Sequence, residues 1–186
     1  MQISLILYVV RKEKKHMKGF DLRMLTLTGV FTALIFVFTA FVHVPSFTGY
    51  VHVGDGFLFL AASILPLPYA LLSGVTGAVL SDCLTGFVVW APASLIIKAT
   101  TVFFFTWKKA TVLTKRNMMA LIPAGILCIG GYYLYEVILS GNFVSPAYGA
   151  IGNLLQAAFS SIVYLLAGTA IDKAKLKARL SLLQRI

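Results

Sequence analysis

MLTLTGVFTALIFVFTAFVH, residues 24–43, is a predominantly apolar run that contains no Lys, Arg, Asp or Glu. The hydrocarbon core of a bilayer is about 30 Å thick, and a helix needs roughly 20 such residues to cross it. The run therefore predicts a membrane-spanning helix.

The whole chain has the composition of a membrane protein. Of its 186 residues, 59% are hydrophobic and 12% are charged, whereas soluble domains carry about half apolar and roughly a quarter charged residues. At roughly 20 residues per crossing, the chain has room for about six or seven spans at most and for no sizeable soluble domain.

Six apolar stretches predict an all-α integral membrane protein with six transmembrane helices. The shortest stretch could instead merge with the next one into a single helix over residues 56–80, which would leave five spans. That helix would contain Pro66 and Pro68, which remove hydrogen-bond donors and block the preceding turn, so we expect a tight turn there. The six stretches are Met24 to His43, Gly56 to Leu65, Tyr69 to Gly86, Ala91 to Trp107, Met118 to Leu139 and Tyr148 to Ile171.

The basic residues gather in clusters that border these stretches. Lys and Arg number 16 against 6 Asp and Glu, and all except Lys98 lie in residues 11–23, 108–116 and 173–185. The alternate connections contain no Lys or Arg. Because cytoplasmic loops carry the excess of positive charge, we expect a multi-pass protein of the cell membrane with both termini inside. The net charge of +10 then reflects orientation in the lipid bilayer, and no nucleic acid is expected as a partner.

This topology divides the chain into three parts. Residues 1–22 form a cytoplasmic basic leader, in which Met17 is an alternative start and the first sixteen residues carry little functional weight. Residues 23–173 form the six-helix membrane domain, and residues 174–186 form a cytoplasmic basic tail.

Ionisable residues within the apolar stretches are candidate site residues, because a charge at the centre of a spanning helix costs about 2.5 to 3.5 kcal/mol on some scales. Asp55 follows a loop and is either an N-cap of the second helix, a ligand contact, or both. Asp82 and Lys98 either pair with each other, or Lys98 donates to an oxygen-rich or anionic molecule in an outward-facing cavity. Glu136 shares a helix face with Tyr132, and together they could bind a heteroaromatic ring.

Several uncharged residues are also candidates. Asn153 and Gln156 share a helix face, where amides either join helices or line a cavity. Trp90 lies near the outer face, where its ring could stack on a ligand. His52 and His43 are too few and too isolated from other ligands to indicate a metal site, so we expect neither a metal nor a cofactor.

Gly29 and Ala33 give the first helix a small-residue spacing that permits close approach of another helix, either within this chain or from a separate membrane partner. The chain has no GxxxxGK[ST], HExxH or GxSxG motif, so we do not expect an enzyme. A channel is poorly supported because no charged ring or filter-like glycine sequence is present.

Two motifs resemble those of a known family. GYVHVGD at residues 49–55 is similar to the Gly-Tyr-x-(His/Asn)-x-Gly-Asp loop, and APASLIIK at residues 91–98 to the Ala-Pro-x-x-x-Ile-Ile-Lys helix, of the S components of energy-coupling factor (ECF) vitamin transporters. The resemblance covers residues 23–173. It implies a six-helix bundle that holds one vitamin-sized molecule near the outer face, and that works with a transmembrane coupling subunit and two ATPase subunits.

The resemblance also implies roles for particular residues. His52 and Asp55 match the loop motif as substrate-binding residues, Lys98 matches the helix motif, and Gly29 and Ala33 best match the docking surface for the coupling subunit. The remaining substrate-binding candidates rest on the physical arguments above. They are Trp90, Tyr132, Glu136, Asn153 and Gln156.

The ligand expected from these side chains is a small hydroxylated heteroaromatic molecule. A pyridoxine or hydroxymethylpyrimidine type comes first, and riboflavin comes second because the loop motif also resembles riboflavin S components. Two other classes stay open, which are a structural membrane protein whose polar residues join helices and a stand-alone transporter of small solutes.

Overall fold

The computed structural model describes residues 21–45 and 50–183, with side chains up to residue 179. Three parts of the sequence analysis lie outside the described residues. They are most of the predicted leader, including its alternative start at Met17, Gly49 of the loop motif, and the last residues of the predicted tail. The elements are α2 (Leu22–Ala40), β1 (His43–Pro45), β2 (Tyr50–His52), α3 (Gly54–Ile64), α4 (Leu67–Leu84), the 3-10 turn η1 (Val88–Trp90), α5 (Ala91–Val102), α6 (Lys115–Ser140), α7 (Ser145–Lys173) and α8 (Leu176–Leu183).

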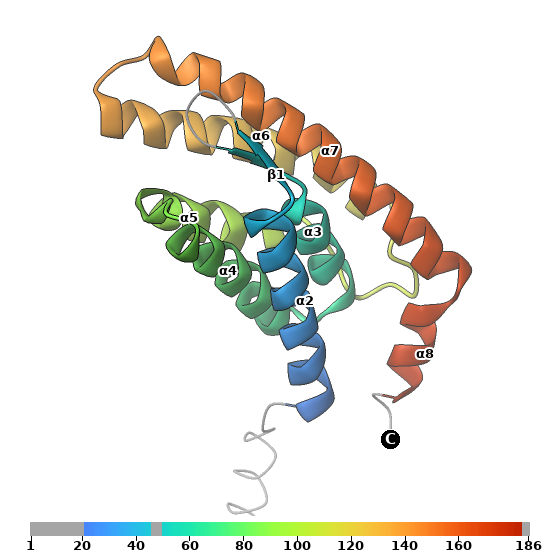
Figure 1. The fold of residues 1–186 in the computed structure, drawn as a ribbon. Coiled ribbons are helices and arrows are strands. Elements are labelled where there is room, and N and C mark those ends of the chain that lie inside the picture. Colours follow the sequence, from blue (N-terminus) through green and yellow to red (C-terminus); the bar gives the residue numbers. More distant parts are fainter. Residues whose placement is uncertain (1–20, 46–49, 184–186) are drawn as a thin grey trace, which may run out of the picture.

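Helix α3 lies at the centre of the bundle, where α2, α4, α5 and α7 all contact it (Figure 1). Nine of its 11 residues, all except Phe57 and Ile64, are buried. A helix that is apolar on every side is stable only when it is enclosed. Since protein surrounds α3, its short length need not match the thickness of a bilayer.

The six predicted stretches correspond to α2 through α7. Helices α3 and α4 are separate because the chain turns at Leu65 and Pro66, so the alternative of one continuous helix is wrong. Pro68 lies in the first turn of α4, where a missing N–H is tolerated. Among the described residues, α2, α4, α6 and α7 are long and apolar enough to cross a membrane, whereas α3 and α5 are shorter.

Helix α5, which corresponds to the fourth predicted stretch, ends at Val102 and not near Trp107. A buried asparagine holds the following segment in another conformation. Asn117 of α6 is fully buried. Its Oδ1 accepts from the Thr106 N–H at 2.7 Å, and its Nδ2 donates to the carbonyls of Thr106 at 3.0 Å and Val112 at 2.8 Å. These bonds satisfy backbone groups that a longer helix would have paired internally.

A short antiparallel hairpin follows α2. The described fold is therefore not entirely helical, as the all-α prediction had it. Strands β1 and β2 pair with His43 opposite His52 and Val44 opposite Val51. Two strands of three residues are too short to give a clear alternation in the sequence. Strand β2 contacts α7, and the hairpin therefore places loop-motif side chains over one end of the bundle.

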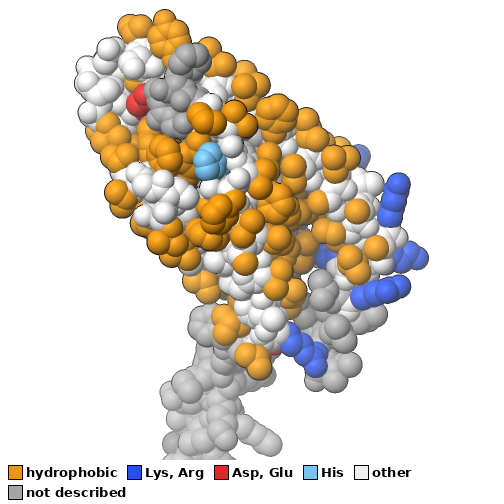
Figure 2. Space-filling view, viewed as in Figure 1, with side chains coloured by type: hydrophobic (Ala, Val, Ile, Leu, Met, Phe, Trp, Pro, Cys, Tyr) orange, Lys and Arg blue, Asp and Glu red, His pale blue; other side chains and the backbone are white. Residues whose placement is uncertain are grey.

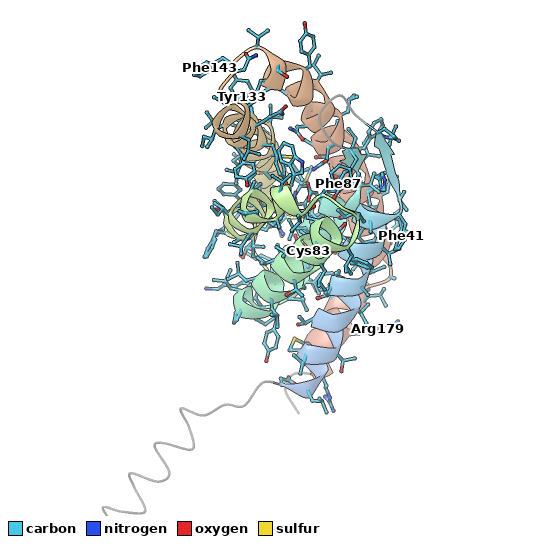
Figure 3. The ribbon with its side chains drawn as sticks, turned by 60° about the vertical axis from the view of Figure 1, so that its left-hand side comes forward. Phe41, Cys83, Phe87, Tyr133, Phe143 and Arg179 are labelled. Carbon is cyan, nitrogen blue, oxygen red and sulfur yellow. The ribbon has the colours of Figure 1, made fainter. Side chains whose placement is uncertain are left out.

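The basic side chains lie at the opposite end of the molecule from the hairpin. Figure 2 shows Lys and Arg gathered where the chain passes into α8 and where α2 begins. In Figure 3, Tyr133 and Phe143 lie toward one end and Arg179 toward the other. Both ends of the described chain are thus on the basic side of the bundle (Figure 1).

Polar contacts close the basic end. Lys177 of α8 is 6% exposed and donates to the Ser63 carbonyl at the last turn of α3, at 2.6 Å. Burial lowers the pKa of Lys177 to about 8, so its ammonium stays largely charged at neutral pH. Asp172 accepts from the backbone N–H groups of Val112 at 2.7 Å and Leu113 at 2.9 Å. These contacts tie α3, α7 and α8 to the segment that precedes α6.

Close packing of α3 on α7 depends on Gly56. A Cβ atom there would lie 2.8 Å from the Ser160 carbonyl oxygen and 2.9 Å from a Val163 methyl carbon. Gly56→Ala should therefore lower the stability of the detergent-solubilised protein by about 1–3 kcal/mol, measured as a fall in its unfolding temperature.

The matched control is Gly130→Ala on α6, where an added Cβ meets nothing within 4 Å. It should leave stability unchanged or slightly raised, because alanine has the higher helix propensity. Equal unfolding temperatures for Gly56→Ala and Gly130→Ala would contradict the close approach of α3 and α7.

Candidate functional site

A cavity opens at the hairpin end of the bundle. The space within it, counted together with the solvent in its open mouth, is about 480 Å³. The hairpin, α4, η1, α5, α6 and α7 all contribute to the wall. The lining residues are Tyr50, Val51, His52, Asp82, Trp90, Ser94, Tyr132, Gly149, Gly152, Asn153 and Gln156.

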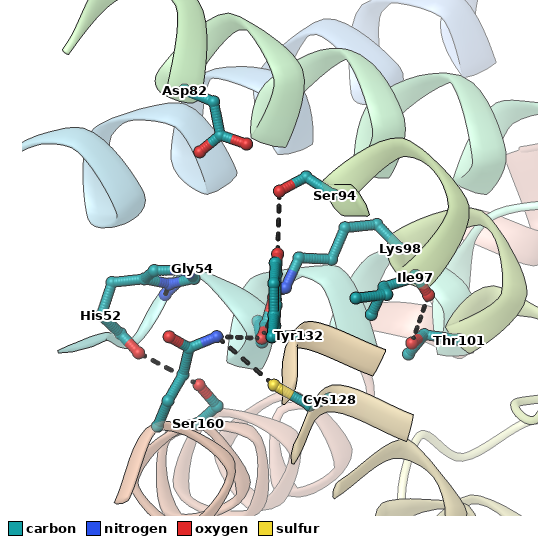
Figure 4. Close-up of polar contacts among 12 residues, drawn as sticks. His52, Gly54, Asp82, Ser94, Ile97, Lys98, Thr101, Cys128, Tyr132 and Ser160 are labelled. Carbon is teal, nitrogen blue, oxygen red and sulfur yellow. Dashed lines mark hydrogen bonds and ion pairs between the residues drawn. The ribbon is translucent and has the colours of Figure 1, made fainter. Parts of the chain in front are cut away.

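Aromatic side chains form one wall of the cavity. The Trp90 and Tyr132 rings meet edge to face with centroids 5.9 Å apart, and Tyr135 supports Trp90 from outside at 5.8 Å. The Tyr132 hydroxyl shares a 2.8 Å hydrogen bond with Ser94 Oγ, which fixes its orientation (Figure 4). The Lys98 ammonium lies 5.2 Å from the centroid of the Tyr132 ring, within range of a cation–π contact.

A buried ion pair lies beside this wall. Lys98 Nζ is 2.7 Å from Asp55 Oδ1 and 2.9 Å from Asp55 Oδ2, and Gln156 Nε2 donates to the same Oδ2 at 2.9 Å. The predicted pair between Asp82 and Lys98 is therefore wrong, because the start of α3 brings Asp55 against α5. The charge of Lys98 is neutralised by Asp55, and a direct contact between Lys98 and a ligand stays a prediction.

The Asp55 side chain does not cap α3. The N-cap residue is Val53, and no side-chain hydrogen bond caps this helix. Asp55 lies in the first turn, where its negative charge is still favourable to the helix dipole. Its role in the structure is thus the ion pair, which crosses from α3 to α5.

His52 enters the cavity from β2. Its Nδ1 accepts a hydrogen bond from the Gly54 N–H at 3.2 Å, so the proton of the neutral ring is on Nε2. Burial, opposed by Asp55 and assisted by Lys98 and His43, lowers the pKa of His52 to about 4. The ring is therefore neutral at physiological pH and can donate from Nε2.

Helix α7 presents a flat polar face to the cavity. Four lining residues of α7 follow helical spacing and therefore share one side of the helix. They are Gly149, Gly152, Asn153 and Gln156. The two glycines leave room for a ligand ring near the backbone, and the two amides supply donors and acceptors beside it. Gln156 is 2% exposed and also contacts the Cys128 sulfur at 3.6 Å.

The structure brings most of the predicted binding residues together. Glu136 lies one turn beyond Tyr132 on α6 and is not among the residues that line the cavity. Tyr50 and Ser94 line it although the sequence analysis did not select them, and only their places within the two motifs could have indicated them. The predicted residues that line it are His52, Trp90, Tyr132, Asn153 and Gln156, with Asp55 and Lys98 adjacent.

Metal ligation has no obvious place here. Within residues 21–45 and 50–179, no group of three or more His, Cys, Asp or Glu side chains is arranged to hold a metal ion. The chemistry that the cavity offers is hydrogen bonding and stacking.

Replacing one member of the buried ion pair should lower the unfolding free energy more than replacing both members. Lys98→Met leaves Asp55 as an uncompensated buried charge, and we expect a loss of about 3–5 kcal/mol in unfolding free energy. The double substitution Asp55→Asn with Lys98→Met should recover part of this loss. Thermal or denaturant unfolding in detergent without added ligand measures both. Wild-type stability in the single variant would contradict the pair, and Lys173→Met, at an exposed position of α7, is the control.

Acid should destabilise the fold through His52. An unfolded histidine titrates near 6.5, whereas His52 in the fold has a pKa of about 4. Between these values the unfolded chain binds the extra proton, so stability is lost as pH falls from about 6.5 toward 4. The unfolding temperature measured across this range should fall less steeply in His52→Asn, which keeps a side-chain acceptor for Gly54. Gly130→Ala, which alters no ionisable group and adds a Cβ in open space, is the control. An unchanged pH profile of the unfolding temperature in His52→Asn would refute the assignment of the acid sensitivity to His52.

The family relationship agrees with this geometry. The model of the family described as ECF-type riboflavin transporter, S component, matches residues 19–173, which include both motifs and every element that lines the cavity. No curated protein matches the sequence. S components are the substrate-binding subunits of vitamin importers in the cell membrane, where they associate with ECF transmembrane and ATPase subunits, and they are not enzymes. The chain belongs to the S-component family of ECF transporters.

Proposed function

We propose that the cavity binds a vitamin-like, hydroxylated nitrogen heterocycle with high affinity at the outward side of the membrane. The observation that supports this proposal is the aromatic wall formed by Trp90 and Tyr132. This wall faces polar groups that are held in place by their own hydrogen bonds. Preorganised groups of this kind lose little entropy when a ligand binds. Uptake of the ligand is then driven by ATP hydrolysis on the partner subunits.

Two kinds of cargo fit this description. A pyridoxine or hydroxymethylpyrimidine type is our first choice, because a single substituted ring would meet donors and acceptors from several elements at once. The groups around it include His52 of the hairpin, Ser94 of α5 and Asn153 of α7. Riboflavin is the second choice, and the description of the matching family favours it.

The proposed orientation places the hairpin and the cavity outside and the basic end in the cytoplasm. The distribution of Lys and Arg supports this, since the described clusters lie where the chain passes into α8 and where α2 begins (Figure 2), away from the hairpin that lines the cavity. On α2, Gly29 and Ala33 are exposed, and a Cβ atom on Gly29 would meet nothing within 4 Å. This open, small-residue face supports the proposal that α2 docks on the transmembrane coupling subunit.

Thermal unfolding against a panel of B vitamins and their precursors tests the proposal. The protein is purified in detergent and freed of any co-purified ligand. A ligand present at about 100 times its dissociation constant should add roughly 2.7 kcal/mol to the unfolding free energy. We expect one compound, of the pyridoxine, hydroxymethylpyrimidine or riboflavin type, to raise the unfolding temperature clearly.

Trp90→Leu provides the matched variant, because it removes the stacking ring while retaining an apolar side chain. The responding compound should shift this variant much less. A folded protein that responds to no compound would favour a structural role for the buried polar residues. Accumulation of solute by vesicles that contain this chain alone would favour a stand-alone transporter.

A further inference from the structure

One carboxylate oxygen in the cavity has an unused hydrogen-bonding capacity. Asp82 of α4 lines the cavity and is 4% exposed. Its Oδ1 accepts from the Tyr50 hydroxyl at 2.9 Å, whereas its Oδ2 is buried without a hydrogen-bond partner among the described residues. In Figure 4 the carboxylate points toward the space between His52 and Ser94. Buried acceptors without a partner are uncommon and costly, so this oxygen is placed to meet something that enters the cavity.

Four other ionisable groups at the cavity carry no net charge between them; they are Asp55, Lys98, His52 and Tyr50. Lys98 and Asp55 neutralise each other in their ion pair. His52 is neutral at physiological pH because burial lowers its pKa to about 4. Burial and the adjacent Asp82 raise the pKa of Tyr50 to about 12, so the phenol keeps its proton. The segment 46–49, SFTG, contains no ionisable side chain.

We propose that Asp82 determines which ligands the cavity accepts. Its Oδ2 receives a hydrogen bond from an N–H or O–H group of the ligand, and its charge selects neutral or cationic heterocycles over those that carry a carboxylate or a phosphate. This inference rests on the proposed function, since it specifies the ligand class of the same cavity.

Two physical effects support the selection. A hydrogen bond to an ionised acceptor is roughly twice as strong as one between neutral groups, so a ligand donor at Oδ2 gains more than it would at an amide. An anionic ligand would instead place a second negative charge beside the buried Asp82 carboxylate, where repulsion is weakly screened. Lys98 cannot offset this repulsion because it is already paired with Asp55.

The test compares, within each set, ligands that share a ring system and differ in charge. Pyridoxine, pyridoxamine and 4-pyridoxic acid share one ring and carry a neutral, a cationic and an anionic substituent at the same position. Riboflavin with riboflavin 5′-phosphate, and hydroxymethylpyrimidine with its phosphate ester, form two further sets. Isothermal titration of the wild-type protein should give a dissociation constant at least 100-fold weaker for the anionic member of whichever set binds.

Asp82→Asn tests the role of the carboxylate charge separately from the shape of the side chain. Asparagine keeps the size of the side chain and an acceptor for Tyr50. The ratio of the dissociation constants of the anionic and the neutral ligand should therefore shrink at least tenfold. Asp82→Ser is the second variant should the first not fold. Asp21→Asn is the control, since it removes the same charge at the N-cap of α2, at the basic end, and asparagine caps helices equally well.

The outcomes separate the inference from the function on which it rests. Binding of one set with no preference against its anionic member would overturn the charge selection while the binding function stood. An unchanged ratio in folded Asp82→Asn would overturn the assignment to Asp82. Binding of none of the three sets would count against the proposed cargo, and the inference would fall with it.

Discussion

The buried ion pair between Asp55 and Lys98 is the interaction on which the arrangement of the cavity depends. Two charges removed from water are tolerated only when their geometry is close and their remaining hydrogen-bonding capacity is used. Here both carboxylate oxygens contact the ammonium, and Gln156 donates to one of them. Helices α3, α5 and α7 must therefore meet in one relative position. Any shift of α3 would leave a charge buried without its partner.

This position of α3 also orients the hairpin. His52 is only three residues before Asp55, and its Nδ1 accepts from the Gly54 N–H at 3.2 Å, so the imidazole follows the start of the helix. Gly54 and Gly56 permit the close approach, because a Cβ at either position would meet Thr39 of α2 or the Ser160 carbonyl of α7. The loop motif thus combines a charge that must be paired with glycines that allow the pairing.

The sequence predicted what depends on local patterns. Hydropathy identified α2 through α7, and the prolines at the end of α3 located the break before α4. It did not identify the partner of Lys98, because Asp55 was considered only as an N-cap or a ligand contact and the pairing depends on how three helices pack. The hairpin was missed since its strands of three residues give almost no periodic signal. Glu136 and Tyr132 were correctly placed on one helix, but their spacing could not indicate where the cavity ends along α6.

The ion pair also changes the chemical character expected of the site. In the sequence, a lysine, two aspartates and a glutamate stand out as ionisable residues of the candidate site. In the structure, Lys98 and Asp55 neutralise each other, and the cavity wall consists mainly of aromatic rings, amides and hydroxyls with the carboxylate of Asp82 among them. A wall of this kind suits a polar but uncharged ring better than an anion.

The central helix explains how such a cavity can exist in so small a bundle. A helix of 11 residues cannot be stabilised by helix propensity alone. The unpaired N–H and C=O groups at its two ends would also be costly inside the protein. Asp55 places a negative charge in its first turn, while the Lys177 ammonium donates to the Ser63 carbonyl in its last turn. Both charges are favourable to the helix dipole. Because the two ends are stabilised by different elements, α3 is short enough to leave space above it for the cavity and is still fixed relative to α5, α7 and α8.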